Sequence, residues 1–153
     1  MKKSIVRKFR SVLRQFDREL FFQNNSACCD GVSMAQCHAL LEIEEKRDIT
    51  VTEVSDLLML NKSTVSRTVD GLVNIGLVDR EIPKENRRTT VLRLTKNGAR
   101  VCNNIHWNND KYVDKTLSVL SKDEQETLIN LLDKVTNQMA VLRNNPENIE
   151  NCC

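Results

Sequence analysis

Apolar residues recur at spacings of three and four along most of this chain, which is the period of helices with one buried face. The pattern is clearest near the start, at Ile5, Phe9, Val12, Leu13, Phe16 and Leu20. Side chains suited to N-caps precede the later helices, at Ser33, Thr50 or Thr52, Asn61 and Ser121. The spacing predicts helices over residues 4–23, 34–46, 52–60, 62–76, 95–120 and 122–145.

The spacing of apolar residues changes in one region of the chain, where apolar and polar residues alternate as is typical of β-strands. Residues 77–82 (LVDREI) and 89–94 (TTVLRL) alternate and are rich in β-branched side chains. The polar segment PKENRR joins them. These features predict a β-hairpin with a basic tip, directly after a helix that ends at Gly76.

Length and composition favour one mainly helical domain. The chain has 153 residues, with only four glycines and two prolines. We find no apolar run of about 18 residues and no secretory signal, so we expect a cytoplasmic protein that does not enter a membrane. Thiols stay reduced in the cytoplasm, so the six cysteines are not expected to form a disulfide framework. The chain carries no phosphate loop, G-x-S-x-G or H-E-x-x-H motif, and we predict that it is not an enzyme.

The charge is unevenly distributed although the net charge is only +2. Residues 1–20 hold seven Lys and Arg against two acids, and residues 61–100 hold nine against four. Residues 101–153 are acidic, with five basic and eight acidic side chains. Local basic surface favours a partner such as nucleic acid, although for residues 1–20 alone an ordinary solvated helix face is the simpler interpretation.

The order of short helix, turn, helix and hairpin is that of a winged helix-turn-helix. In residues 62–76 the apolar side chains fall on one stripe, and the small polar and basic ones fall largely outside it. Such a helix can bury one face and present hydroxyls and an Arg to phosphates and base edges in the major groove, while wing arginines enter the minor groove. The predicted DNA contacts are Lys62, Ser63, Thr64, Ser66 and Arg67 on the helix and Lys84, Arg87 and Arg88 on the wing.

The segment ITVTEVSDLLMLNKSTVSRTVDGLVNIGLVDREIPKENRRTTVLRLTKNG resembles the DNA-binding core of the MarR (multiple-antibiotic-resistance) family of bacterial regulators. The matching features are the helix pair, the GLV-x-R entry to the wing and the RR…V-x-x-LT exit, and the likeness extends over residues 4–143. One position departs from the family pattern: Asn86 stands where an Asp usually precedes the wing arginines. This departure weakens the orientation of the wing, in which Arg88 is our first choice for the minor groove and Arg87 the second.

The resemblance implies a mainly α (α+β) fold and a single domain over residues 1–153. It implies a winged helix-turn-helix core at about 48–98, dimerisation helices at about 4–46 and 97–143, and a polar tail at 144–153. It also implies a homodimer on a palindromic DNA operator, acting as a repressor that an effector releases. Three amphipathic helices outside the core, whose apolar stripes need a partner, agree with that expectation.

The cysteines raise the question of the effector. Cys28, Cys29 and Cys37 lie within ten residues, in a loop and at the start of a helix, where a thiolate is stabilised. Such a cluster suits a soft metal or metalloid ion, namely As(III), Cu(I), Cd(II) or Zn(II), as well as an oxidant or an electrophile. Cys102 and His106 form a second, weaker ligand candidate at i, i+4, and a core cysteine with a polar-facing histidine is the simpler interpretation. Cys152 and Cys153 fall in the polar tail.

Three hypotheses follow from the sequence. The first is a regulator that senses through its thiols. The second is the same regulator with inert cysteines and a small organic ligand as its effector. The third is a thiol redox or metal-buffering protein that uses the winged helix only as a scaffold.

Overall fold

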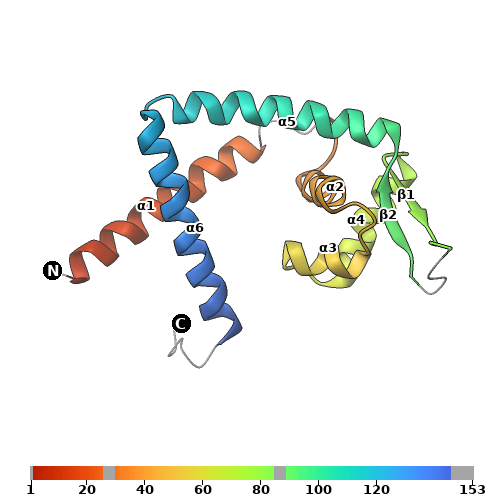
Figure 1. Cartoon of the computed structure of the whole chain (residues 1–153), viewed down its shortest axis with the longest axis horizontal. Coiled ribbons are helices and arrows are strands. Elements are labelled where there is room, and N and C mark those ends of the chain that lie inside the picture. Colours follow the sequence, from red (N-terminus) through yellow and green to blue (C-terminus); the bar gives the residue numbers. More distant parts are fainter. Residues whose placement is uncertain (1, 26–29, 85–88, 146–153) are drawn as a thin grey trace. The chain divides into compact units, whose positions relative to one another are not determined.

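The computed structural model describes residues 2–25, 30–84 and 89–145 of the chain, and its fold is mainly helical with one small sheet (Figure 1). The predicted fold class is confirmed, and all six predicted helices and both strands are present within a few residues of their expected bounds. In chain order the elements are α1 (Lys2–Asn25), α2 (Met34–Lys46), α3 (Val51–Leu58), α4 (Lys62–Asn74), β1 (Val78–Glu81), β2 (Val91–Leu94), α5 (Lys96–Leu117) and α6 (Lys122–Asn144).

The chain forms two compact units, Met1–Asn109 and Asp110–Cys153, and α5 runs from the first into the second. The first unit contains the helix-turn-helix pair α3 and α4, with α2 and the hairpin of β1 and β2 beside them (Figure 1). The second unit contains the end of α5 and all of α6. None of the helices in the described ranges is long and apolar enough to cross a membrane.

Helix starts in this chain are fixed by local side-chain bonds. Ser33, Thr50 and Ser121 each accept a hydrogen bond from the backbone N–H three residues on. The side chains of Gln36, Glu53 and Glu124 accept one in return from the cap backbone. These three capping boxes satisfy N–H groups that the first helical turn leaves without a partner.

The core lies between α2, α3, α4, the hairpin and the start of α5. Its fully buried side chains are almost all aliphatic, which matches the low aromatic content of the sequence. Leu92 of β2 also donates its backbone N–H to the Ile49 carbonyl at 2.7 Å. This contact forms an isolated β-bridge beside the hairpin, and the sequence did not predict the bridge. The largest fully buried side chains are Leu40, Ile43, Leu72, Leu92, Ile105, Val54, Val65, Val69, Val78 and Cys102.

The connection between α4, the hairpin and α5 is tight. Gly76 has φ +72°, and the N–H groups of Gly76 and Leu77 donate back to the Val73 and Leu72 carbonyls, which is the Schellman end of a helix. Further along, a Cβ at Gly98 would lie 2.0 Å from the Leu77 carbonyl oxygen. Only glycine therefore lets the first turn of α5 approach the start of β1 this closely.

The outer helices keep their apolar stripes exposed in the single chain. On α1 the exposed apolar residues include Ile5, Val6, Phe9, Val12, Leu13, Phe16, Leu20 and Phe21. On α6 they include Ile129, Leu131, Leu132, Val135, Met139 and Val141. So much apolar surface on amphipathic helices is typical of a protein–protein interface.

Candidate nucleic-acid interface

The second helix of the helix-turn-helix pair, α4, has one buried and one exposed face. Val65, Val69 and Leu72 are buried against α2 and α3, and Val73 packs against the core, as the spacing predicts. Among the predicted contact residues, Lys62, Ser63 and Arg67 are exposed, and Thr64 and Ser66 are partly exposed. The helix thus presents small hydroxyl groups and two cationic side chains on the side away from the core.

The start of α4 is held by the Asn61 side chain. Its Oδ1 accepts hydrogen bonds from the Thr64 backbone N–H and from the Ser63 hydroxyl, both at 2.8 Å. One turn later, Arg67 donates from Nε to the Ser63 carbonyl at 3.3 Å. This bond leaves the terminal nitrogens of the guanidinium for an external partner, and two N–H groups in a fixed fork match either a phosphate or the O6 and N7 atoms of guanine.

An ion pair ties α4 to the hairpin. The Arg80 Nη2 atom on β1 lies 2.7 Å from the Asp70 Oδ1 atom on α4. The sequence pattern did not predict this pair, although the two residues flank the Gly76 turn at which α4 ends. The pair joins the first strand of the hairpin to α4.

A second set of ion pairs braces the base of the hairpin. Arg93 of β2 binds Glu81, across the register from Val91, and also binds Asp48 in the loop before α3. The hydrogen bond from Arg93 holds the pKa of the Asp48 carboxyl below its usual range. Asp48 has a positive φ of 48°, and its contact with Arg93 helps to hold this turn in place.

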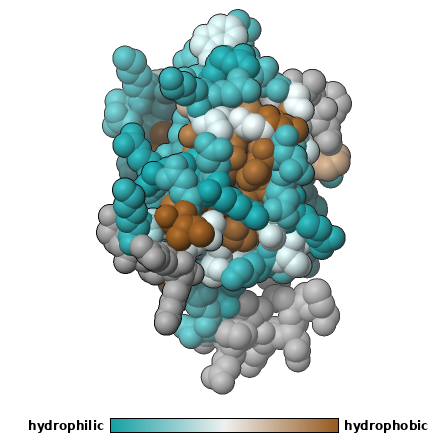
Figure 2. All heavy atoms as spheres, turned by 90° about the vertical axis from the view of Figure 1, so that its right-hand side faces the viewer, coloured by the Kyte–Doolittle hydropathy of each residue, from teal (hydrophilic) through white to brown (hydrophobic). Residues whose placement is uncertain are grey.

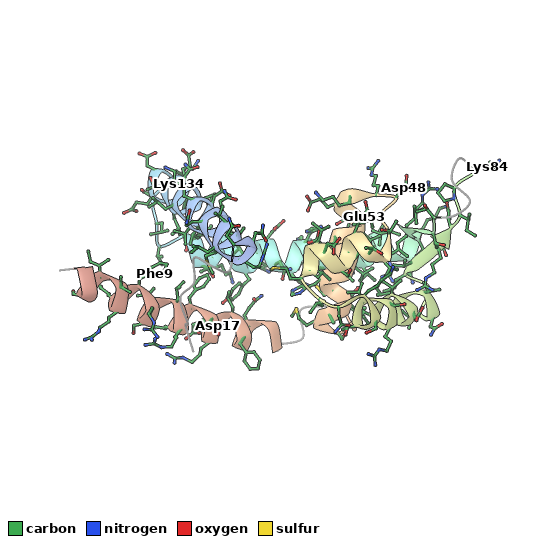
Figure 3. All side chains as sticks on the ribbon, turned by 90° about the horizontal axis from the view of Figure 1, so that it is seen from below. Phe9, Asp17, Asp48, Glu53, Lys84 and Lys134 are labelled. Carbon is green, nitrogen blue, oxygen red and sulfur yellow. The ribbon has the colours of Figure 1, made fainter. Side chains whose placement is uncertain are left out.

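The tip of the wing is described only in part. Lys84 is exposed at its base and is labelled in Figure 3. Arg87, Arg88 and Asn86, on which the predicted minor-groove contact depends, lie outside the described residues. Figure 2 faces the hairpin end of the molecule and shows hydrophilic side chains around apolar areas in the middle of this face.

The thiols on which sensing was predicted lie in different surroundings. Cys37 is on α2, as predicted, but its side chain is only 2% exposed and belongs to the core. Cys28, Cys29, Cys152 and Cys153 lie outside the described residues. Asp30, which follows Cys29 in sequence, accepts a 3.0 Å hydrogen bond from the Asn104 side chain on α5. An oxidant or metal ion would therefore reach Cys37 only if the surrounding core opened.

Cys102 and His106 both lie on α5 but have different partners. The Cys102 thiol is fully buried and lies 3.9 Å from the Leu40 carbonyl oxygen. Burial, with a smaller contribution from the nearby Glu44 carboxylate, raises the pKa of the Cys102 thiol to about 11. His106 is half-exposed, and its Nε2 atom lies 2.6 Å from the Glu44 Oε2 atom. Among the residues that the structure describes, no group of three His, Cys, Asp or Glu side chains is placed to hold a metal ion.

A cavity of about 400 Å³ opens beside the end of α2. Its lining combines apolar and charged side chains, and it lies within the first unit. Its lining residues are Ile43, Glu44, Arg47, Asp48, Arg93, Leu94 and Ala99. A pocket of this size and mixed polarity is large enough for a small organic ligand.

Comparison with known proteins places this geometry in a family. The profile of the MarR family matches residues 32–90, which run from the start of α2 into the wing. The multiple antibiotic resistance protein MarR of Escherichia coli is 31% identical over 106 residues, which are 68% of this chain and 73% of that protein. The chain belongs to the MarR family. The HTH-type transcriptional regulator BilQ of Clostridium symbiosum is 24% identical over 106 residues, 69% of this chain and 74% of that protein.

The fold matches solved MarR-type structures as well. The crystal structure of Streptococcus pneumoniae FabT in complex with DNA superposes with a TM-score of 0.75 at 22% identity, over 89% of this chain and 97% of that one. At this identity the likeness establishes the fold alone. As a member of the MarR family, the protein is a DNA-binding transcriptional regulator and not an enzyme, and proteins of this family are dimeric.

Proposed function

We propose that this MarR-family protein is a homodimeric repressor whose α4 reads a palindromic operator through Lys62, Ser63, Thr64, Ser66 and Arg67. The observation that carries the proposal is the two-faced α4, buried through Val65, Val69 and Leu72 and exposed through its cationic and hydroxyl side chains. Wing residues Lys84, Arg87 and Arg88 would add contacts in the neighbouring minor groove. The single domain of residues 1–153 would hold this core at about 48–98, in the cytoplasm.

Dimerisation would use the helices outside the core, at about 4–46 and 97–143. The exposed apolar stripes of α1 and α6 support this part of the proposal, because a single chain leaves them in water. A two-fold symmetric dimer presents two recognition helices, and half-sites about one helical turn apart then follow from its symmetry. A change in the spacing of the two helices would be enough to release the operator.

The release signal would act through thiols, with Cys28 and Cys29 as the reactive pair. Cys37 would join them as a third ligand only when the core around it opens, because its side chain is buried. The hydrogen bond from Asn104 to Asp30, the residue after Cys29, supports a link between this segment and α5. A soft metal or metalloid ion, an oxidant or an electrophile that reacts there would pull on α5 through Asp30. Cys102 is less suited to the role, because a buried thiol with a pKa of about 11 carries very little thiolate at neutral pH.

A small organic ligand is the second candidate effector. The cavity beside the end of α2 supports it, because two arginines, Arg47 and Arg93, line a partly apolar space of about 400 Å³. Arg93 also belongs to the ion pairs at the base of the hairpin. An anionic ligand that competed for Arg93 would therefore disturb the wing directly, with the cysteines inert.

Release of DNA by candidate effectors tests the proposal. The operator is first located by footprinting the DNA upstream of the protein's own gene, and release is then titrated with arsenite, copper, zinc, cadmium, peroxide and a quinone. We expect at least one of them to release the wild-type dimer but not a Cys28/Cys29/Cys37→Ser variant. A Cys152/Cys153→Ser variant is the matched control and should respond like the wild type.

Each of the other outcomes excludes one part of the proposal. If the wild type and the Cys28/Cys29/Cys37→Ser variant respond alike to all six agents, thiol sensing through these residues is wrong. If a small organic acid releases both proteins equally, the effector site is the cavity and the cysteines are inert. If the wild type binds no DNA but binds a soft metal tightly, the protein is a metal-buffering protein on a winged-helix scaffold.

A further inference from the structure

The face of α1 opposite its apolar stripe carries a row of arginines. Arg7, Arg10, Arg14 and Arg18 recur at steps of three, four and four, and all four side chains are exposed. On a helix with 3.6 residues per turn they fall within an arc of about 80°, and the row is about 17 Å long. Figure 3 shows nitrogen-tipped side chains gathered along one edge of α1. We call this row the arginine stripe.

The arginine stripe has no acidic partner among the residues that the structure describes. In the described part of the molecule, no ion pair involves any of its four arginines. The two acids of α1 do not lie within the arc, since Asp17 borders it and Glu19 lies on another side of the helix. Four like charges held in one row repel one another, and a bound polyanion would relieve this repulsion.

The stripe stays accessible when α1 pairs with another chain. Its centre lies about 145° around the helix from the centre of the apolar residues between Ile5 and Leu20. Phe21, near the end of α1, is the one exposed apolar residue named above that falls within the arc of the arginines. The apolar residues between Ile5 and Leu20 are the part of α1 that a MarR-type dimer would cover. The arginines would then face away from the dimer interface, on a surface that neither dimerisation nor the recognition helix uses.

Two other partners fit this geometry less well. A helix that lies on a membrane buries its apolar side, which would turn the centre of the stripe away from the lipid headgroups. Acidic side chains of α6 are the second alternative. Glu126 and Asp133 lie about 150–170° around α6 from its apolar side. If α1 and α6 packed through their apolar sides, these two acids would therefore lie away from the arginine stripe. A phosphate backbone suits the stripe, because Arg forks bind phosphates in pairs and a strand offers a charge about every 3.4 Å along the duplex.

We infer that the arginine stripe is a second DNA-binding surface, which binds the phosphate backbone of duplex DNA without reading sequence. Each dimer would carry two such stripes in addition to its two recognition helices. The protein would then hold DNA outside its operator, either the flanks of the same duplex or a second segment. This inference is independent of the effector proposed above, but it does assume a DNA-binding protein.

The test uses the full-length dimer and a variant with Arg7, Arg10, Arg14 and Arg18 each replaced by Gln. A second variant with Lys8, Lys115, Lys122 and Lys134 each replaced by Gln is the control, because it removes the same charge from other faces. Binding to a long non-operator duplex is measured by fluorescence anisotropy over a range of salt concentrations. We expect the control to match the wild type, and the stripe variant to bind at least about tenfold more weakly at low salt. Its salt slope should be less steep by about 0.9 for each phosphate that it no longer neutralises, and its operator footprint should keep its position.

An Arg67→Ala variant separates the two surfaces. It should bind the operator about 5- to 150-fold more weakly and keep the salt-dependent binding of non-operator DNA. Equal affinity and equal salt slope for the wild type and the stripe variant would overturn the inference while leaving operator binding intact. A stripe variant that becomes monomeric by light scattering, or that loses binding to anionic phospholipid vesicles but not to DNA, would also overturn it. If the wild type binds no DNA of any kind, the proposed function fails first.

Discussion

Asp70 on the recognition helix and Arg80 on the first strand of the wing form an ion pair, with 2.7 Å between Oδ1 and Nη2. Both side chains are about half-exposed, so the pair adds little to the stability of the fold. Its effect is geometric, because it couples the two elements that are expected to enter neighbouring grooves of the DNA. Loss of the pair should therefore lower the affinity for DNA more than it lowers the free energy of unfolding.

We predict that Arg80→Gln lowers the free energy of unfolding by less than about 1 kcal/mol and weakens operator binding by more than that. Urea unfolding and anisotropy titration of the operator give the two quantities on the same preparation. The exchanged pair, Asp70→Arg with Arg80→Asp, should recover part of the affinity. Equal decreases in stability and in affinity would show that the pair has no separate role in positioning the wing.

Gly98 and Gly71 offer a matched pair of substitutions. A Cβ at Gly98 would lie 2.0 Å from the Leu77 carbonyl oxygen, whereas at Gly71 its nearest neighbour is the end of the Gln36 side chain at 3.0 Å. We predict that Gly98→Ala destabilises the protein by more than about 2 kcal/mol, because backbone must move. Gly71→Ala should be close to neutral, since the gain in helix propensity of about 1 kcal/mol offsets a small shift of Gln36. Thermal unfolding of both variants tests this; a Gly98→Ala protein as stable as the wild type would contradict the close contact.

Glu53 in the capping box of α3 gives the fold a dependence on acid pH. The Thr50 backbone N–H, and after it the Thr50 hydroxyl, donate to the Glu53 carboxylate and lower its pKa. A carboxyl whose pKa is lower in the folded state contributes stability above its unfolded pKa of about 4.3, and this stability is lost as the pH falls through the folded value. We predict that the difference in stability between the wild type and Glu53→Gln shrinks as the pH falls from about 5 to about 3. A Glu42→Gln variant controls for the loss of one charge. If the difference in stability between the wild type and Glu53→Gln stays the same across this pH range, the hydrogen bonds from Thr50 to Glu53 are not the source of that difference.

Cys102 should be chemically inert in the folded protein. Its thiol is buried and has a pKa of about 11, so almost none of it is thiolate at pH values near neutral. We predict that iodoacetamide modifies Cys102 far more slowly in the native protein than in urea, as measured by peptide mass spectrometry. Rapid modification of Cys102 under native conditions would contradict this prediction and would make Cys102 a candidate sensing residue.

Local features of this fold could be predicted from the sequence, and most tertiary features could not. The capping residues Ser33, Asn61 and Ser121 act within their own first helical turn, so their spacing was enough to place three helix starts. For α3 the sequence left Thr50 and Thr52 open, and the structure has Thr50 as the cap. The same holds for the buried stripe of α4, because a helical period fixes which side chains share a face. The order of the elements then indicated the winged helix-turn-helix.

The ion pairs at the base of the wing depend on how the hairpin packs against its neighbouring elements. Arg93 reaches both Glu81 and Asp48, and Gly98 contacts Leu77, only because β1, β2 and α5 meet at one corner. The simpler interpretation of Cys102 and His106, a core cysteine and a polar-facing histidine, agrees with the structure. Their spacing did not indicate their partners, the Leu40 carbonyl and the Glu44 carboxylate. Pairwise contacts of this kind follow from the packing of whole elements, which a periodic pattern does not specify.

The role of α4 as the recognition helix is the central claim, and Arg67 is the residue that tests it most directly. The measurement is an anisotropy titration of the footprinted operator with the wild type, with Arg67→Ala, and with Arg100→Ala on α5 as the control. We predict that Arg67→Ala loses about 1–3 kcal/mol of specific binding while Arg100→Ala binds like the wild type. An Arg67→Ala protein that binds the operator as tightly as the wild type, with the same footprint, would contradict the role of α4 in recognition.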